Sequence, residues 1–259
     1  MVDFVAGSDE TAGQVNTVKV NMIVSGGKSV YGAKVGILML EAQFPRIVGD
    51  MGNALTWRFP VRYKVVRGAS PDRVVRQGAT GLFDDFLAAG QELVADGVEV
   101  ITTNCGFLSL FQDDLAAALD VPVATSSMMQ AAQIQAMLPS GKKVGILTIS
   151  IETLTQKHLS AAGVPEGTPI AGVAPNCEFQ RVILNDELHL DVDKAEADMV
   201  AAAKAFHADH PDLGALLFEC TNMPPYAAAV RAATGLQVFS IVDFVNWFQG
   251  STNGMPSNS

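Results

Sequence analysis

The sequence predicts an α/β protein made of two pseudo-symmetric, Rossmann-like halves, each a mainly parallel sheet flanked by helices, with a cleft between them. Three observations predict this fold class. Apolar runs of strand length alternate with helical patterns from residue 33 to residue 249, and the pattern restarts near residue 141. Each half also carries a cysteine directly after a buried strand. Such alternation is typical of parallel sheets that are wrapped by helices.

The first half, residues 33–140, contains elements that follow from their residue patterns. Buried apolar runs and apolar–polar alternation predict strands, whereas apolar residues at helical spacing predict helices. The expected strands are Lys34–Leu40, Val61–Val66, Val98–Thr102 and Val121–Ala124, and the expected helices are Asp72–Asp96 and Gly106–Leu119.

The second half, residues 141–249, shows the same alternation. The expected strands are Lys143–Leu147, Ile170–Val173, Gly214–Phe218 and Val238–Ile241, and the expected helices are Thr153–Ala162, Asp193–His207 and Pro225–Ala233. We expect a C-terminal helix over 241–249 that packs back on the first half. The polar segments 1–32 and 250–259 are weakly patterned, which predicts an N-terminal arm and a disordered C-terminal tail.

A weak internal repeat relates the two halves. The tetrapeptide Val-Gly-Ile-Leu occurs at Val35 and again at Val144, 109 residues later, and Cys220 follows Cys105 by 115 residues. Each cysteine follows a buried strand and precedes a helix. Because ligands of open α/β sheets bind at the carboxyl ends of the strands, the repeat predicts that both thiols face one cleft.

Two thiols on opposite sides of a substrate suit proton transfer at carbon. We therefore expect Cys105 and Cys220 to be the catalytic residues. The start of a helix should lower the pKa of a thiol there, because N–H groups and the helix dipole stabilise a thiolate. One thiolate can then remove a proton next to a carboxylate while the other thiol returns a proton to the opposite face, which inverts the carbon.

Further polar side chains are expected around the substrate. The candidate substrate-binding residues flank the cysteines, lie in the loop after the first strand or follow the equivalent strand of the second half: they are Asn104, Gly106, Thr221, Asn222, Arg46, Asn53, Thr148 and Ser150. An arginine can bind a carboxylate as a fork, and amide or hydroxyl donors can stabilise an enolate. Glu219 directly precedes Cys220, so strand alternation predicts that its side chain points the other way.

Composition excludes several classes of function. The 259-residue chain has 17 Lys and Arg against 27 Asp and Glu, a net charge of −10, which argues against binding nucleic acid. No apolar stretch is long enough to cross a membrane, and no basic segment followed by an apolar one marks an export signal, so we expect a cytoplasmic protein. The three cysteines suit free thiols. Neither a metal site nor a dinucleotide fingerprint is evident, and we expect no cofactor.

The two cysteine motifs carry a family resemblance. Thr103-Asn104-Cys105-Gly106 and Glu219-Cys220-Thr221-Asn222, each after a buried strand of a duplicated chain, resemble the aspartate/glutamate/hydantoin racemase superfamily over roughly residues 33–245. The resemblance implies two pseudo-symmetric domains, two catalytic cysteines, no cofactor and a homodimer. Cys220-Thr221 matches the second motif of that superfamily. Cys105 departs from the first motif, since Gly106-Phe107 follows it where the amino-acid racemases have Asn-Thr.

These observations predict a cofactor-independent racemase or epimerase. Its expected substrate is a small amino-acid-like carboxylate or a hydantoin, inverted at the carbon alpha to the carboxyl or carbonyl group. Two alternatives remain open at this point. One is a decarboxylase, lyase or cis–trans isomerase of the same superfamily, of the arylmalonate decarboxylase or maleate isomerase type. The other is a non-catalytic protein that binds small acids.

Overall fold

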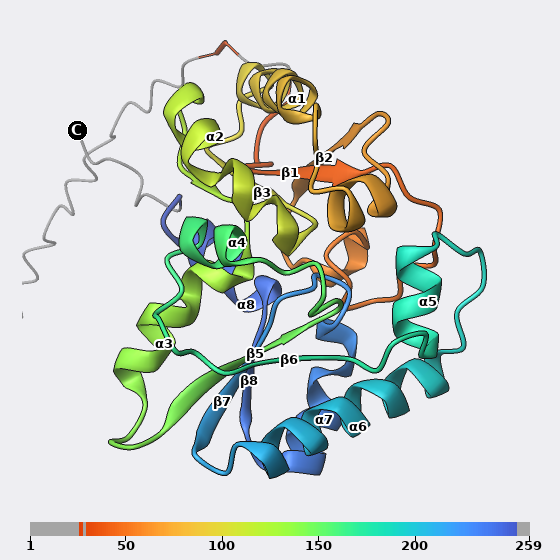
Figure 1. The fold of residues 1–259 in the computed structure, drawn as a ribbon. Coiled ribbons are helices and arrows are strands. Elements are labelled where there is room, and N and C mark those ends of the chain that lie inside the picture. Colours follow the sequence, from red (N-terminus) through yellow and green to blue (C-terminus); the bar gives the residue numbers. More distant parts are fainter. Residues whose placement is uncertain (1–25, 28–29, 253–259) are drawn as a thin grey trace, which may run out of the picture.

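The computed structural model describes residues 26–27 and 30–252, which form two four-stranded sheets with helices on their faces (Figure 1). All strand pairs within both sheets are parallel. The predicted fold class, an α/β protein with two similar parallel sheets, is therefore confirmed.

The first sheet has the strand order β2-β1-β3-β4. Its strands are β1 (Val35–Leu40), β2 (Val61–Val66), β3 (Val100–Thr103) and β4 (Val123–Ala124). Side chains of β1 alternate between two faces, as a strand requires. Val35 and Ile37 pack in one apolar cluster, whereas Leu38 and Leu40 pack in another.

The second sheet has the equivalent order, β6-β5-β7-β8. Its strands are β5 (Lys143–Thr148), β6 (Ile170–Gly172), β7 (Leu213–Phe218) and β8 (Gln237–Phe239). In both sheets the first strand of the half lies between the second and third strands, and the fourth strand lies at the edge beyond the third. The internal repeat in the sequence thus corresponds to two sheets of the same topology.

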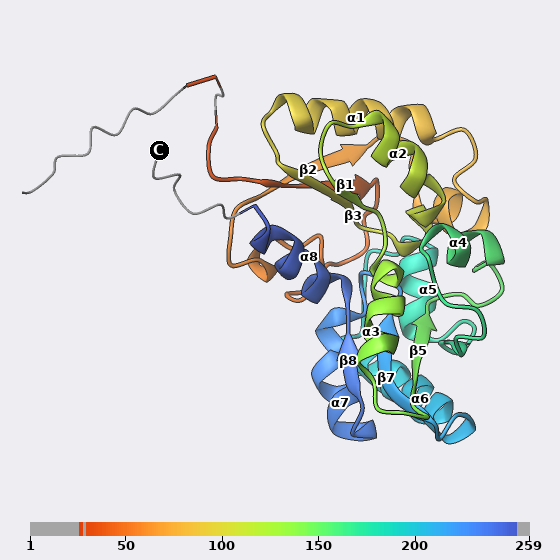
Figure 2. The ribbon, with the colours of Figure 1, turned by 90° about the vertical axis from the view of Figure 1, so that its left-hand side faces the viewer.

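Helices cover both faces of each sheet. The α-helices are α1 (Phe83–Ala95), α2 (Gln112–Ala118), α3 (Ala131–Met137), α4 (Gln156–Ala161), α5 (Glu178–Leu184), α6 (Val192–Asp209), α7 (Ala227–Thr234) and α8 (Ile241–Gly250), and the short helical turns are η1 (Ala54–Thr56), η2 (Asp72–Arg76), η3 (Gly106–Phe111), η4 (Ser127–Gln130) and η5 (Pro224–Tyr226). Figure 2 shows α1 and α2 on one face of the first sheet and α8 on the other. Ile241 and Phe244 of α8 join the apolar cluster of Val35 and Ile37, so the last helix packs on the first sheet.

The prediction of one continuous helix over Asp72–Asp96 is wrong. The segment splits into η2 and α1, because Gly78, Ala79 and Gly81 between them have φ angles of +64°, +53° and +72°. These values lie in the left-handed region, which no right-handed helix can include. Near the C-terminus, the expected strand Val238–Ile241 ends early because α8 already begins at Ile241. The expected helices also do not include α3 and α5.

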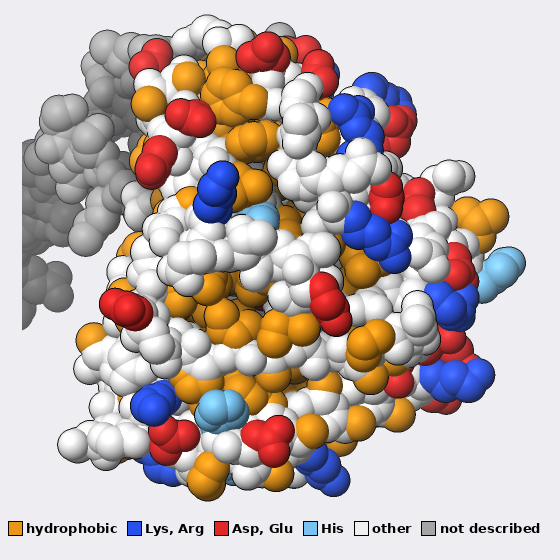
Figure 3. Space-filling view, viewed as in Figure 1, with side chains coloured by type: hydrophobic (Ala, Val, Ile, Leu, Met, Phe, Trp, Pro, Cys, Tyr) orange, Lys and Arg blue, Asp and Glu red, His pale blue; other side chains and the backbone are white. Residues whose placement is uncertain are grey.

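The terminal segments and the surface charge were also predicted from the sequence. The expected arm over 1–32 and tail over 250–259 lie almost wholly outside the described residues, and the limits of the two halves stay predictions. Within the described part of the chain, no helix is both long and apolar enough to span a membrane. On the face drawn in Figure 3, acidic and basic side chains are scattered without a continuous basic area, in keeping with the net charge of −10.

Candidate active site

Cys105 and Cys220 lie just beyond the carboxyl ends of β3 and β7, the equivalent strands of the two sheets. Cys105 immediately precedes η3, and the backbone N–H groups of Phe107 and Leu108 lie within hydrogen-bonding reach of its thiol. Both cysteines are free and buried. The strand ends therefore bring the two thiols to the same region, as the repeat predicts.

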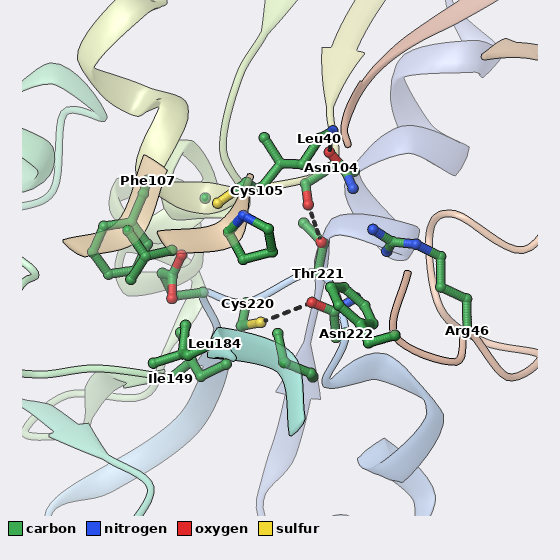
Figure 4. A pocket seen from close by; sticks show the side chains of 16 residues that line it. Leu40, Arg46, Asn104, Cys105, Phe107, Ile149, Leu184, Cys220, Thr221 and Asn222 are labelled. Atoms are coloured by element: carbon green, nitrogen blue, oxygen red, sulfur yellow. Dashed lines mark hydrogen bonds between the residues drawn. The ribbon is translucent and has the colours of Figure 1, made fainter. Parts of the chain in front are cut away.

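A small pocket, partly open to solvent, lies between the two cysteines. Figure 4 shows Cys105 and Cys220 entering it from opposite sides. Its walls are mostly apolar: the apolar lining residues are Leu40, Phe44, Pro71, Val75, Phe107, Ile149, Ile183 and Leu184. Apolar walls with a few polar groups are typical of small-molecule sites, and the apolar walls strengthen electrostatic interactions inside.

Both thiols are neutral in this pocket near neutral pH. Burial, followed by the negative charge of Glu219, raises the pKa of Cys105 to about 12, although the N–H groups of Phe107 and Leu108 oppose the shift. The same two causes raise the pKa of Cys220 well above its ordinary value. The expectation of lowered thiol pKa values is therefore wrong, because the cost of burying a charge exceeds the stabilisation by the N–H groups.

Cys220 begins a chain of polar contacts that reaches Arg46. Its thiol donates to Oδ1 of Asn222 at 3.4 Å, and Nδ2 of Asn222 donates to Asp50 at 2.5 Å. Arg46 in turn forms an ion pair with the Asp50 carboxylate at 3.0 Å. These contacts hold Cys220 as a hydrogen-bond donor and partly neutralise Asp50.

Asn104 lines the pocket and carries a buried side-chain N–H group that has no partner among the described residues. Its Oδ1 accepts from the Leu40 N–H at 2.7 Å, and its backbone carbonyl accepts from the Thr221 hydroxyl at 2.5 Å. The side chain is 3% exposed, and within the described residues its Nδ2 has no hydrogen-bond partner. A buried donor without a partner is costly, so a ligand oxygen at this position is favoured.

Glu219 also lines the pocket, contrary to the expectation from strand alternation. The strand β7 ends at Phe218, so the two-residue alternation no longer holds at Glu219 and Cys220. Oε2 of Glu219 accepts a hydrogen bond from the Thr148 hydroxyl at 2.8 Å. The carboxyl group lies so close to Gly106 that a Cβ atom there would approach Oε1 to 2.2 Å.

The structure brings most, but not all, of the predicted site residues together. Besides both cysteines, the predicted residues that line the pocket are Asn104, Gly106, Thr221, Asn222 and Arg46. Asn53 instead caps η1, since its Oδ1 accepts from the Leu55 N–H and its Nδ2 donates to the Arg46 carbonyl. Thr148 contacts the pocket only through Glu219, and the Ser150 hydroxyl donates to Glu152.

Solved structures with this fold include enzymes of two reaction classes. Unliganded arylmalonate decarboxylase superposes with a TM-score of 0.58 at 16% identity, covering 87% of this chain and 94% of that chain. A glutamate racemase from Bacillus anthracis gives a TM-score of 0.57 at 14% identity, covering 87% and 85% of the two chains. At these identities the comparison establishes the shared fold.

Sequence comparison identifies relatives that are more similar to this chain than the solved structures are. No family model matches the chain. The dimethylsulfoniopropionate lyase of Durusdinium sp. clade D is 30% identical over 226 residues, which cover 83% of this chain and 74% of that protein. Dimethylsulfoniopropionate lyase 7 of Emiliania huxleyi (strain CCMP1516) is 31% identical over 233 residues, covering 83% of this chain and 65% of the relative. The match to the Durusdinium protein shows that the chain belongs to the dimethylsulfoniopropionate lyase family, and its fold is the one found in aspartate and glutamate racemases and in arylmalonate decarboxylase.

Proposed function

We propose that this protein is a lyase that eliminates dimethyl sulfide from dimethylsulfoniopropionate. The observation that carries the proposal is the match to lyases of this name over 83% of the chain. The pocket supports it, because an apolar cavity with two thiols and a free amide donor suits removal of a proton next to a carboxylate. The proposal replaces the expected racemase with the lyase alternative.

The carboxylate of the substrate would accept a hydrogen bond from Nδ2 of Asn104. Cys105 is the better base of the two thiols, because two backbone N–H groups, those of Phe107 and Leu108, can stabilise its thiolate, whereas Cys220 has only that of Asn222. The thiolate takes a proton from the carbon next to the carboxylate, and the electron pair left behind forms the carbon–carbon double bond. The bond from the β-carbon to sulfur breaks, and the sulfur leaves with its electron pair as neutral dimethyl sulfide. The second product is acrylate.

Cys220 stays a thiol in this scheme. The Cys220 S–H group donates a hydrogen bond to Asn222. Cys220 can therefore give a proton to the substrate more readily than it can remove one. Elimination to dimethyl sulfide needs no such proton, because the sulfonium sulfur becomes neutral when it leaves with the electron pair of the carbon–sulfur bond. A second candidate function, racemisation of a carboxylate without a β-leaving group, is favoured by one observation: both thiols line the same pocket.

Release of dimethyl sulfide from dimethylsulfoniopropionate tests the lyase proposal. Wild type should release the gas, measured by headspace chromatography, and Cys105→Ala should lower kcat at least about a hundredfold because the base is lost. Cys177→Ala is the matched control, because that cysteine does not line the pocket and should leave kcat unchanged. No release by folded wild type, or full activity in Cys105→Ala, would contradict the proposal.

A further inference from the structure

Glu219 is a buried acid that the elimination scheme leaves without a role. Its side chain is 1% exposed and lines the pocket together with both cysteines. The Thr148 hydroxyl donates to Oε2, and the Ile149 N–H also stabilises the ionised form, but burial dominates and raises the pKa of Glu219 to about 7. Glu219 therefore carries a substantial negative charge near neutral pH inside an apolar cavity.

Among the described residues, that charge has no cationic partner. In the described part of the chain, none of the ion pairs includes Glu219. Arg46, which also lines the pocket, is paired with Asp50 and stacks over the ring of Phe44 at 4.4 Å. A buried charge without a partner is costly, so a cation that enters beside Glu219 is strongly favoured.

The walls near Glu219 suit a cation that carries methyl groups. Phe107 follows Gly106, which the Glu219 carboxyl group contacts, and Ile149 supplies a second apolar side chain to the pocket. Aromatic faces attract alkylated cations, and apolar side chains accommodate the methyl groups themselves. A hydrated metal ion or a primary amine lacks the apolar surface that would fill this region.

The pocket is electrically asymmetric along its length. In Figure 4, Phe107 lies on one side of the two cysteines, and Asn104 and Arg46 lie on the other. Asn104 presents its unpartnered amide donor on the second side, while the Glu219 carboxyl group touches Gly106, the neighbour of Phe107. A molecule with a carboxylate at one end and a methylated cation at the other matches this asymmetry, and its central carbons then lie between the thiols.

We propose that Glu219 is the specificity-determining counter-charge for a methylated onium group on the β-carbon of the substrate. This inference rests on the proposed elimination for the identity of that onium group. The same cation offsets the repulsion that Glu219 exerts on both thiols, so that a thiolate becomes accessible when the correct substrate is bound. Cleavage of the carbon–sulfur bond converts the cation into a neutral sulfide, which removes the attraction and favours release.

Two non-cleavable ligands of equal shape test this role without catalysis. 3-(Trimethylammonio)propionate carries the cation, and 4,4-dimethylpentanoate has a carbon atom in place of the charged nitrogen. Isothermal titration calorimetry with wild type should show at least about tenfold tighter binding of the ammonium ligand. Glu219→Gln should lose most of that preference while its affinity for the neutral ligand is unchanged or higher.

Two further variants control for loss of folding and for the removal of a carboxylate elsewhere on the protein. Glu219→Asp keeps the charge and should retain part of the preference, whereas Glu166→Gln removes an exposed carboxylate outside the pocket and should change neither affinity. Circular dichroism verifies that each variant is folded. If Glu219→Gln is unfolded, the test uses wild type and Glu219→Asp. A preference of wild type for the ammonium ligand that is reduced in Glu219→Asp supports the role of Glu219, and no preference in wild type contradicts it.

The outcomes separate this inference from the proposed function. Equal binding of the two ligands by wild type, no binding of the ammonium ligand, or an intact preference in folded Glu219→Gln would overturn the role of Glu219. Wild type that releases dimethyl sulfide but shows no preference would remain a lyase without this counter-charge. Wild type that prefers the ammonium ligand but releases no dimethyl sulfide would keep the counter-charge and lose the lyase reaction.

Discussion

Gly106 is the residue that makes room for the Glu219 carboxyl group. A Cβ atom at this position would lie 2.2 Å from Oε1 and 2.6 Å from the carbonyl oxygen of Glu219. Gly106→Ala must therefore displace Glu219 and should cost about 1–3 kcal/mol of unfolding free energy, with a marked loss of activity. Urea denaturation and the dimethyl sulfide assay measure the two effects. Gly250→Ala, where the added Cβ meets no atom within 4 Å, is the control, and equal behaviour of the two variants would contradict the argument.

The titration of Glu219 predicts a pH dependence of ligand binding. Because its pKa is raised to about 7, the carboxyl group is neutral well below that pH and gains its charge as the pH rises through it. Binding of 3-(trimethylammonio)propionate should therefore strengthen from pH about 6 to about 8, and that of 4,4-dimethylpentanoate should not. Calorimetry across this range measures the change, which Glu219→Gln should abolish.

Other charged groups around Glu219 do not produce the same profile. The two pocket thiols have raised pKa values and stay neutral in this range, and Asp50 is held in its ion pair with Arg46. His158 packs against Phe107 at 5.0 Å between ring centroids, but burial lowers its pKa, so it loses its proton at a lower pH than an ordinary histidine. A profile that persists in Glu219→Gln would assign the titration to one of these groups instead.

At the scale of single elements, α7 depends on a glycine at its end. Gly235, directly after the helix, has a φ of +71° in the left-handed region and donates its N–H to the Arg231 carbonyl. Gly235→Ala should lower the unfolding free energy by about 1 kcal/mol, because alanine is strained at this φ. Gly235→Asn should lose less, since asparagine tolerates this conformation better. Thermal denaturation ranks the variants, and an unchanged or raised Tm in Gly235→Ala would contradict this account.

Strands could be predicted from the sequence more securely than helices. β1 and β7 read as continuous apolar runs because both of their faces are covered, and the structure buries nearly all of their side chains. The helix over Asp72–Asp96 could not be predicted correctly from spacing. Apolar residues continue at helical intervals across the break, and alanine is not a residue type that indicates the left-handed conformation of Ala79. The pattern of α5, a seven-residue helix, is too short to stand out.

At the scale of the whole molecule, α8 ties the second half of the chain to the first sheet. Phe244 is 7% exposed and packs in the cluster that contains Val35 and Ile37. Phe244→Ala should cost about 3 kcal/mol and still give a single unfolding transition, because the loss of packing affects both halves at once. Trp247→Ala, at a position 63% exposed, should have a much smaller effect. Two separate transitions in urea denaturation of Phe244→Ala would contradict this coupling.

The repeat explains how far the site could be predicted from the sequence. Matching positions in two equivalent sheets place Cys105 and Cys220 in one pocket, and neighbours such as Asn104 and Asn222 follow with them. Glu219 was missed because alternation was extended one residue past the end of β7. The direction of the thiol pKa shifts also could not be predicted, because it depends on burial by distant residues such as Ile149 and Leu184. The expected homodimer stays a prediction.

The most direct test of the central claim follows the fate of the carbon next to the carboxylate. Wild type is incubated in D₂O with dimethylsulfoniopropionate and, separately, with single enantiomers of small amino acids and hydroxy acids, and ¹H NMR records the products. We predict acrylate and dimethyl sulfide in equal amounts from the first substrate, and loss of both in Cys105→Ala. Deuterium uptake with inversion of an amino or hydroxy acid, without release of dimethyl sulfide, would contradict the lyase and restore the racemase.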